Sequence, residues 1–231
     1  MPKGVLSDCV MMVIGGVLGG LLGRNLSDRC RAELNNVVGI MAMGIAITLI
    51  PGIHTLGPVM LALVVCYVIG YALDFDGHVN RGILLATRKI FGDRGNIDVD
   101  NFSVLIVLMA FGGSGLIGTM TEGLTGDSSL LMGRSICDFI TCMMFGTIIG
   151  PLSCLVAIPA MVSLLAFQFG ATLIMPYMTD PVYANFKASG GMLTLMGALK
   201  MFGVSKAKPM NAVLSVILIV PITTVWLRFF P

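Results

Sequence analysis

Residues 112–129 read GGSGLIGTMTEGLTGDSS, a run of glycines, hydroxyls and carboxylates that stands between two long apolar stretches. A glycine inside a helix costs about 1 kcal/mol relative to alanine, so this run predicts either close helix packing or a broken helix. Lipid tolerates irregular backbone only where protein or water satisfies its polar groups. The run is therefore either an exposed turn or the place where the protein binds something polar.

The rest of the composition indicates that lipid is the solvent for much of the chain. Of 231 residues, 56% are hydrophobic and 11% are charged, and the mean hydropathy is +0.96. Soluble domains carry about 25% charged residues. The net charge is only +2, without the basic face and aromatic readers typical of nucleic-acid binding. We expect a membrane protein with no nucleic-acid partner.

About 20 mainly apolar residues cross a bilayer, and this rule predicts an all-α polytopic membrane helix bundle. We expect a single domain over residues 1–231 with about eight spans and a glycine-broken helix around residues 112–129. A polar connector, either an amphipathic helix on the membrane surface or a solvated linker, occupies residues 74–101. The expected spans cover residues 8–23, 35–53, 56–73, 102–121, 130–149, 152–175, 189–202 and 209–229.

Charge and glycine patterns give the orientation and a packing face. Basic residues gather in the loops after the first, third and seventh spans, whereas the opposite loops hold one Lys and no Arg. The positive-inside rule places these basic loops in the cytoplasm and both termini outside. In the first span, Gly15, Gly19 and Gly23 share one helical face, and such a face packs closely against another helix.

The carboxylates of residues 112–129 suggest an ion or solute site. Asp127 or the following serines can cap the next helix, and an open helix N-terminus attracts an anion. Glu122 and Asp127 could instead carry a proton or coordinate a cation. Arg134 and Asp138 lie four residues apart on one helical face. They form either a structural ion pair facing the bundle interior or part of a solute path.

These observations predict a substrate- or ion-binding site. Asp127 is expected to cap a helix and bind a coupling ion, either Na⁺ or H⁺. Glu122 is expected to be a proton or cation site, and Arg134, restrained by Asp138, to attract an anionic group. The candidate residues are Ser114, Thr119, Glu122, Thr125, Gly126, Asp127, Ser129, Arg134, Asp138 and Gln168.

Enzyme signatures are missing from the sequence. It contains no P-loop and no zinc-ligand cluster, and we expect neither enzymatic activity nor a bound cofactor. An intramembrane protease needs two carboxylates that meet. Asp127 and Asp138 are 11 residues apart, about three turns along one continuous helix, so this pair cannot share a proton.

The central motif resembles a known family. Residues 123–131, GLTGDSSLL, followed by Ser135 and Asp138, are similar to domain-of-unknown-function family 554, the YqgA/YdfK-like bacterial membrane proteins. The resemblance covers nearly the whole chain. This chain departs from the family pattern with Asp8 in place of Asn and Arg134 in place of Lys. The resemblance implies a multi-pass protein of the bacterial cytoplasmic (inner) membrane and implies no settled activity.

Three function classes follow from these expectations. The leading one is a secondary transporter or channel-like carrier of a small polar or charged solute. The second is a non-transporting membrane scaffold or regulatory protein, in which residues 112–129 form only a tight turn, and the third is an intramembrane enzyme. The expected partners are the lipid bilayer, a small solute and a second copy of the chain, because short helices with glycine seams invite packing into a homodimer.

Overall fold

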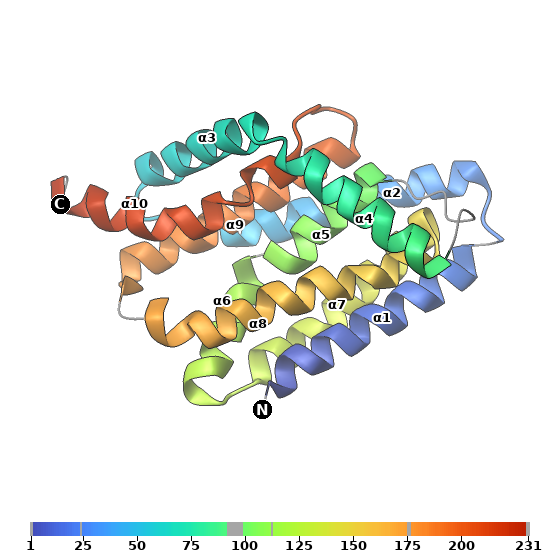
Figure 1. The fold of residues 1–231 in the computed structure, drawn as a ribbon, viewed down its shortest axis with the longest axis horizontal. Helices are drawn as coiled ribbons and strands as arrows, with labels where there is room; N and C mark the ends of the chain where they lie inside the picture. The colour runs from blue at the N-terminus through green and yellow to red at the C-terminus, as the bar shows by residue number, and fades with distance from the viewer. Residues whose placement is uncertain (1, 24, 92–98, 112, 175–176, 230–231) are drawn as a thin grey trace.

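The computed structural model describes residues 2–23, 25–91, 99–111, 113–174 and 177–229 (Figure 1). Over these ranges the regular elements are helices, and no strand occurs. The all-α bundle expected from the sequence is confirmed. The longer helices are α1 Lys3–Gly23, α2 Asp28–Leu49, α3 Leu56–Ala72, α4 Phe75–Phe91, α5 Val99–Phe111, α6 Gly113–Thr125, α7 Ser129–Ile149, α8 Ala157–Ile174, α9 Asp180–Met201 and α10 Ser215–Phe229. Two short 3₁₀ helices, η2 Pro151–Val156 and η4 Pro209–Ala212, precede α8 and α10.

The helices α1 and α7 pack more closely than any other pair of described helices. Glycines on α1 allow this close approach. A Cβ atom on any of three α1 glycines would overlap the main chain of α7. The contacts advance together along both helices, which shows that α1 and α7 run parallel: Gly15 lies against Phe139, Gly19 against Met143 and Gly23 against Thr147. The glycine seam predicted from the sequence is therefore used inside one chain.

The helices α3 and α10 run in opposite directions. Gly57 and Gly70 of α3 lie against Trp226 and Asn211 respectively, so α3 and α10 are antiparallel. Six described helical segments are long and apolar enough to cross a membrane, and the start of α4, bent by 62° from α3, adds a seventh when joined to it. The helix α9 has 22 residues and covers the seventh expected span, but it is not among the segments that are apolar enough to cross a membrane. The described residues therefore contain six or seven candidate spans, where the sequence predicts about eight.

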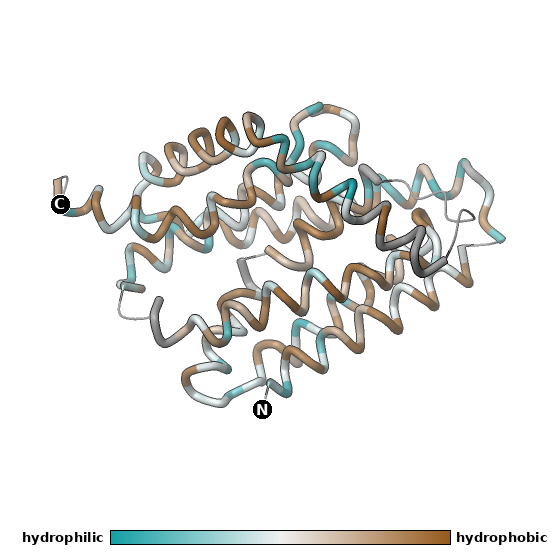
Figure 2. The backbone as a smooth tube through the Cα atoms, in the orientation of Figure 1, coloured by the Kyte–Doolittle hydropathy of each residue, from teal (hydrophilic) through white to brown (hydrophobic). Residues whose placement is uncertain are grey.

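Hydropathy follows this arrangement. Figure 2 shows hydrophobic residues along α3, α8 and α10 and hydrophilic residues at the start of α4 and at the turn before η4. Large apolar side chains on the outer face of α1, such as Leu6, Leu21 and Leu22, are more than half exposed. An apolar exterior of this extent marks a surface that contacts lipid or protein rather than water.

The segment α5–α6 forms the centre of the bundle, with 93% of its most apolar stretch buried. The chain is helical from Gly113 to Thr125 and leaves the helix at Gly126, which has φ +75°. Within α6 the glycines serve close packing: a Cβ on Gly118 would meet the Leu131 side chain at 3.1 Å, and one on Gly123 would meet the Gln168 carbonyl oxygen at 2.6 Å. A break at residue 112 falls outside the described residues.

The expected polar connector is largely helical. Residues 75–91 form α4 and residues 99–101 begin α5, whereas residues 92–98 lie outside the described part of the chain. A buried carboxyl fixes the corner between α3 and α4. The Asp76 main-chain N–H donates to Asn211 Oδ1 at 3.0 Å, and Lys208 Nζ lies 2.9 Å from Asp76 Oδ2. This buried charge at the end of the bundle has a structural role.

The α1–α7 seam should limit stability. We expect Gly19→Ala to lower the unfolding free energy by about 1–3 kcal/mol, because the added methyl overpacks the helix contact. The matched control is Gly44→Ala on α2, where a Cβ meets nothing within 4 Å. That change should leave stability unchanged or raise it by up to about 1 kcal/mol. Thermal melting of both variants in the same detergent checks this, and equal melting temperatures would contradict the seam.

Candidate functional site

Two charged side chains are buried in the middle of α7. Arg134 Nε lies 2.9 Å from Asp138 Oδ2, and the two side chains are 10% and 7% exposed. Arg134 and Asp138 are the sixth and tenth of 21 residues in α7, so both lie more than one turn from either end of the helix. A charge at this depth of a membrane bundle costs at least about 2.5 kcal/mol unless it is paired. The expected ion pair forms and faces the interior.

The end of α5 and the start of α6 hold the guanidinium in place. Arg134 Nη2 donates to the Met109 carbonyl oxygen at 3.2 Å, and a cation at the last turn of a helix is favourable for the helix dipole. Gly115 leaves the space that Arg134 Nη1 occupies, since a Cβ there would overlap it. Ser163 Oγ of α8 donates a hydrogen bond to the neighbouring carbonyl oxygen, that of Ala110, at 3.0 Å. The glycine-rich run thus provides the room for Arg134.

A third charged residue joins the pair from α1. Asp8 is fully buried and interacts electrostatically with Asp138 and Arg134, and its carboxyl lies beside the Ser135 hydroxyl. The Ser135 Oγ itself donates to the Leu131 carbonyl oxygen at 2.8 Å. The parallel α1–α7 seam brings Asp8 to this place. The buried centre therefore contains two carboxyl groups and one guanidinium.

A cavity of about 390 Å³ adjoins the charged centre. Its wall contains Arg134 and Asp138 from α7 and apolar side chains from α2 and α5. Hydroxyl groups add to the lining: Thr48, Thr141 and Thr194. Solute sites are typically hollows of about 300–1,000 Å³ with apolar walls and a few fixed polar groups, and this cavity fits that description.

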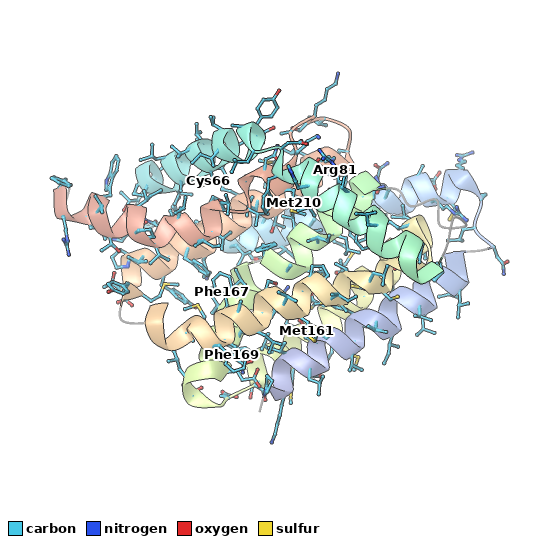
Figure 3. All side chains as sticks on the ribbon, in the orientation of Figure 1. Cys66, Arg81, Met161, Phe167, Phe169 and Met210 are labelled. Carbon is cyan, nitrogen blue, oxygen red and sulfur yellow. The ribbon has the colours of Figure 1, made fainter. Side chains whose placement is uncertain are left out.

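Two other hollows lie between α8 and α10. They measure about 560 Å³ and 400 Å³, and both are lined by Ala166, Phe167 and Ile217 between α8 and α10. Figure 3 labels Phe167 and Met210, which line the larger one from α8 and η4. Their linings are almost entirely apolar, so neither offers the charged groups that would hold a polar solute.

Glu122 serves the N-terminus of α1. Its Oε1 accepts a hydrogen bond from the Gly4 main-chain N–H at 2.8 Å, and Glu122 is 5% exposed. A carboxylate that accepts from a free N–H at a helix start stabilises that helix. Gly4 and Asp8 lie one turn apart on α1, so this cap helps to fix the helix end that carries Asp8.

The motif around Asp127 is an exposed turn. Asp127 accepts from the Ser129 main-chain N–H at 2.9 Å and from the Ser129 hydroxyl at 2.6 Å, while Thr125 Oγ1 accepts from the Asp127 N–H at 3.2 Å. Asp127 thus bonds the first residue of α7, whereas the N-cap position itself is Ser128, which makes no side-chain cap bond. The Ser129 bonds lower the pKa of Asp127 below its usual value. The stabilisation is therefore complete above the ordinary carboxyl pKa and is lost as the pH falls through the lowered value.

The remaining expected site residues do not reach the charged centre through any described bond. Thr119 is buried and donates to the Gly115 carbonyl oxygen at 2.6 Å. Gln168 packs on Gly123 through its main chain, and its Oε1 is buried without a partner among the described residues. The side chain of Ser114 lies outside the described part of the chain. The exposed turn has Gly126 at its start, with nothing within 4 Å of a Cβ there.

Comparison with known proteins identifies one family over nearly the whole chain. A family model described as "Protein of unknown function (DUF554)" matches residues 3–224. The chain belongs to this family. The Escherichia coli K12 protein named "Uncharacterized protein YqgA" is 30% identical over 234 residues and is covered completely, as is this chain. No solved structure matches significantly. DUF554 membership confirms the resemblance in the sequence and supplies no activity.

In this DUF554 protein, sequence reasoning left Asp8 outside the site. The expected span begins at Asp8, whereas α1 begins at Lys3 and so places Asp8 in its second turn. An ionisable residue inside an apolar span is a functional candidate by default, and the earlier helix start was the signal that could have found it. The partner of Asp8 is on a helix more than 120 residues away, and spacing alone does not show that contact. Among the described residues, no group of three or more His, Cys, Asp and Glu side chains could hold a metal ion.

The charged centre predicts a strong energetic coupling. We expect Arg134→Gln to lower the unfolding free energy by about 3–5 kcal/mol, because it leaves buried carboxylates without their cation. Adding Asp138→Asn should recover about 0.5–3 kcal/mol of that loss. Reversible unfolding of the wild type, both single variants and the double variant in mixed micelles measures this cycle. Additive effects would show that the pair does not interact.

Proposed function

We propose that this DUF554 protein is a secondary transporter or channel-like carrier of a small polar or charged solute, with its binding site at the cavity beside Arg134 and Asp138. The observation that carries the proposal is a buried ion pair at mid-helix that forms part of a cavity wall. A purely structural ion pair needs no adjoining space. Arg134 and Asp138 both line a hollow large enough for a small metabolite.

The arrangement of the helices supports this function. The site lies where four helices meet, α2, α5, α7 and α9, and charged groups inside membrane bundles typically mark solute and ion paths. The glycines of α6 and α1 allow close approach of helices, so small relative movements could open the cavity to either side. The exposed turn at residues 125–129 is not part of this proposed site.

A second function has one observation in its favour. The carboxyl groups of Asp8 and Asp138 meet on neighbouring helices, and paired carboxyls are also the chemistry of aspartic hydrolases. In this protein, of the two carboxyl groups only that of Asp138 is among the described residues that line the cavity, so the pair cannot act together on a substrate held there, as hydrolysis needs. We therefore propose a carrier rather than an enzyme.

We also propose that the carrier sits in the bacterial cytoplasmic membrane with its basic end in the cytoplasm. One end of the bundle, where α1, α3, α7 and α9 finish, carries Arg29, Arg31, Arg81, Lys200, Lys206 and Lys208. Lys3, Lys187 and Arg228 lie in the opposite half. The positive-inside rule then leaves both termini outside.

The proposed orientation has a direct test. Alkaline phosphatase is active only outside the cytoplasm, so a fusion after residue 231 should be active, whereas a fusion after Lys206 should be inactive. Green fluorescent protein fused at the same two positions should give the reverse pattern. An active phosphatase at Lys206 together with an inactive one at the C-terminus would reverse the orientation.

A homodimer remains part of the proposal, with reduced support. The glycine face of α1 that suggested it is occupied by α7 and η2 within the same chain. The remaining reason is that a bundle of short helices encloses little volume. Native mass spectrometry from the membrane would show the mass of one chain or of two.

Transport through the cavity should depend on its free space. We expect Gly133→Leu to reduce solute flux in proteoliposomes by about tenfold or more, because the new side chain fills the cavity and displaces binding energy of at least about 1.4 kcal/mol. Gly133 lines the cavity, and a Cβ there meets nothing within 4 Å, so the protein should fold normally. A screen of amino acids, organic acids and inorganic ions identifies the solute.

Matched variants separate the site from its surroundings. Gly44→Leu places the same side chain on α2 in open space and should keep wild-type flux. Asp127→Asn alters only the exposed turn and should do the same. If Gly133→Leu transports as well as Gly44→Leu, the cavity is not the solute path. If Asp127→Asn alone abolishes flux, the site lies at the turn instead.

A further inference from the structure

Asp8 is a buried carboxyl group that the proposed solute site does not explain. It is fully buried in α1, and neither of its two carboxyl oxygens accepts a hydrogen bond from a donor among the described residues. A buried ionised carboxylate without a donor is very costly, and such groups take up a proton or a cation instead. Asp8 therefore points to a ligand of that kind.

The ionisable groups around Asp8 come from several helices. From α7 it faces Arg134 and Asp138, with Cys142 nearby on the same helix. Cys9 is next to it in the sequence, and Glu122 of α6 caps Gly4 one turn away. From η2 the ionisable side chain is Cys154, and α8 has no ionisable residue in its described part.

The charges in this centre do not balance when every group is ionised. Two carboxylates stand against one guanidinium, and that guanidinium already contacts Asp138 and the Met109 carbonyl oxygen. Gly4 lies against Leu131 and Gly15 against Phe139, and this register of α1 and α7 sets Asp8 beside Asp138, with which its carboxyl group interacts. Ionised carboxylates only accept hydrogen bonds, so a bond between two of them requires one proton. A single bound proton both balances the charge and forms this bond.

A proton fits the centre better than a metal ion. Metal cations such as Ca²⁺ and Mg²⁺ need about six oxygen ligands, and no group of three or more acidic, histidine or cysteine side chains in the described chain could supply a metal site. Two carboxyl groups at close range are sufficient to bind one proton, because two like charges at that distance are not both ionised.

We propose that Asp8 and Asp138 share one proton, and that this proton is the ion that couples solute movement across the membrane. The coupling rests on the carrier function proposed above, whereas the shared proton does not. A solute that draws Arg134 toward itself removes the cation from Asp138, and the carboxyl pair then holds its proton more tightly. By reciprocity, the bound proton favours the solute. Only an O–H bond forms and breaks, and the proton enters from one side and leaves to the other.

The shared proton has a readout that does not depend on transport. Infrared spectroscopy of the protein in lipid at neutral pH should show the C=O stretch of a protonated carboxylic acid, and D₂O should shift it. Carboxyl-¹³C aspartate should shift the same band in the wild type. Asp8→Asn and Asp138→Asn should each remove it. The control Glu122→Gln changes a buried carboxyl that has a main-chain donor, and it should leave the band in place.

Two results would overturn the shared proton. One is the absence of any protonated aspartate band in the isotope-labelled wild type, which needs no variant and so does not depend on folding. The other is a band that persists in folded Asp8→Asn and Asp138→Asn proteins. Either result would mean that both carboxyls are ionised or that another group carries the proton.

Coupling is tested by flux with the membrane potential clamped at zero. A gradient of one pH unit should allow the wild type to accumulate its solute about tenfold for one proton per solute. Asp8→Asn should equilibrate the solute without accumulating it, and a sodium gradient should have no effect. Solute flux that ignores the pH gradient, or that follows sodium, refutes proton coupling and leaves the carrier intact. If the infrared band of protonated aspartate is present but no solute is transported, the carrier function is refuted and the shared proton stands.

Discussion

The need to compensate charge inside an apolar bundle constrains the rest of this structure. Arg134 and Asp138 lie inside α7, and their side chains are only 10% and 7% exposed. Their stability depends on each other, on the Met109 carbonyl oxygen and on the space that Gly115 leaves. Because an isolated charge there would cost several kcal/mol, the packing of α5, α6 and α7 is arranged around the guanidinium.

The glycine seam between α1 and α7 brings the third charge into this centre. Close contact of the two main chains at Gly15, Gly19 and Gly23 aligns the helices in parallel, and the same alignment sets Asp8 against the Arg134–Asp138 pair. Glu122 then caps the start of α1 through the Gly4 N–H. Helix packing and electrostatics are therefore linked, since a change in the seam also moves a carboxyl group.

The charged centre and the exposed turn have separate physical roles. Asp127 bonds to Ser129 at a helix start in an exposed position, where a carboxylate is well solvated and needs no other partner. The carboxyl groups of Asp8 and Asp138 are buried, and Asp138 lines a cavity; there, charges interact strongly because little water screens them. This contrast is why the proposed transport chemistry belongs to α1 and α7.

The sequence alone determined that the chain is a membrane protein, that it is all-helical and which family it belongs to, together with some local interactions. Apolar runs and the spacing of Arg134 and Asp138 are short-range features, and they predicted the helices and the ion pair. Tertiary structure decided which charges meet. Asp8 and Asp138 are separated by about 130 residues, and the lengths and directions of the intervening helices bring them together. The cavity likewise exists only between helices, so no single stretch of sequence contains it.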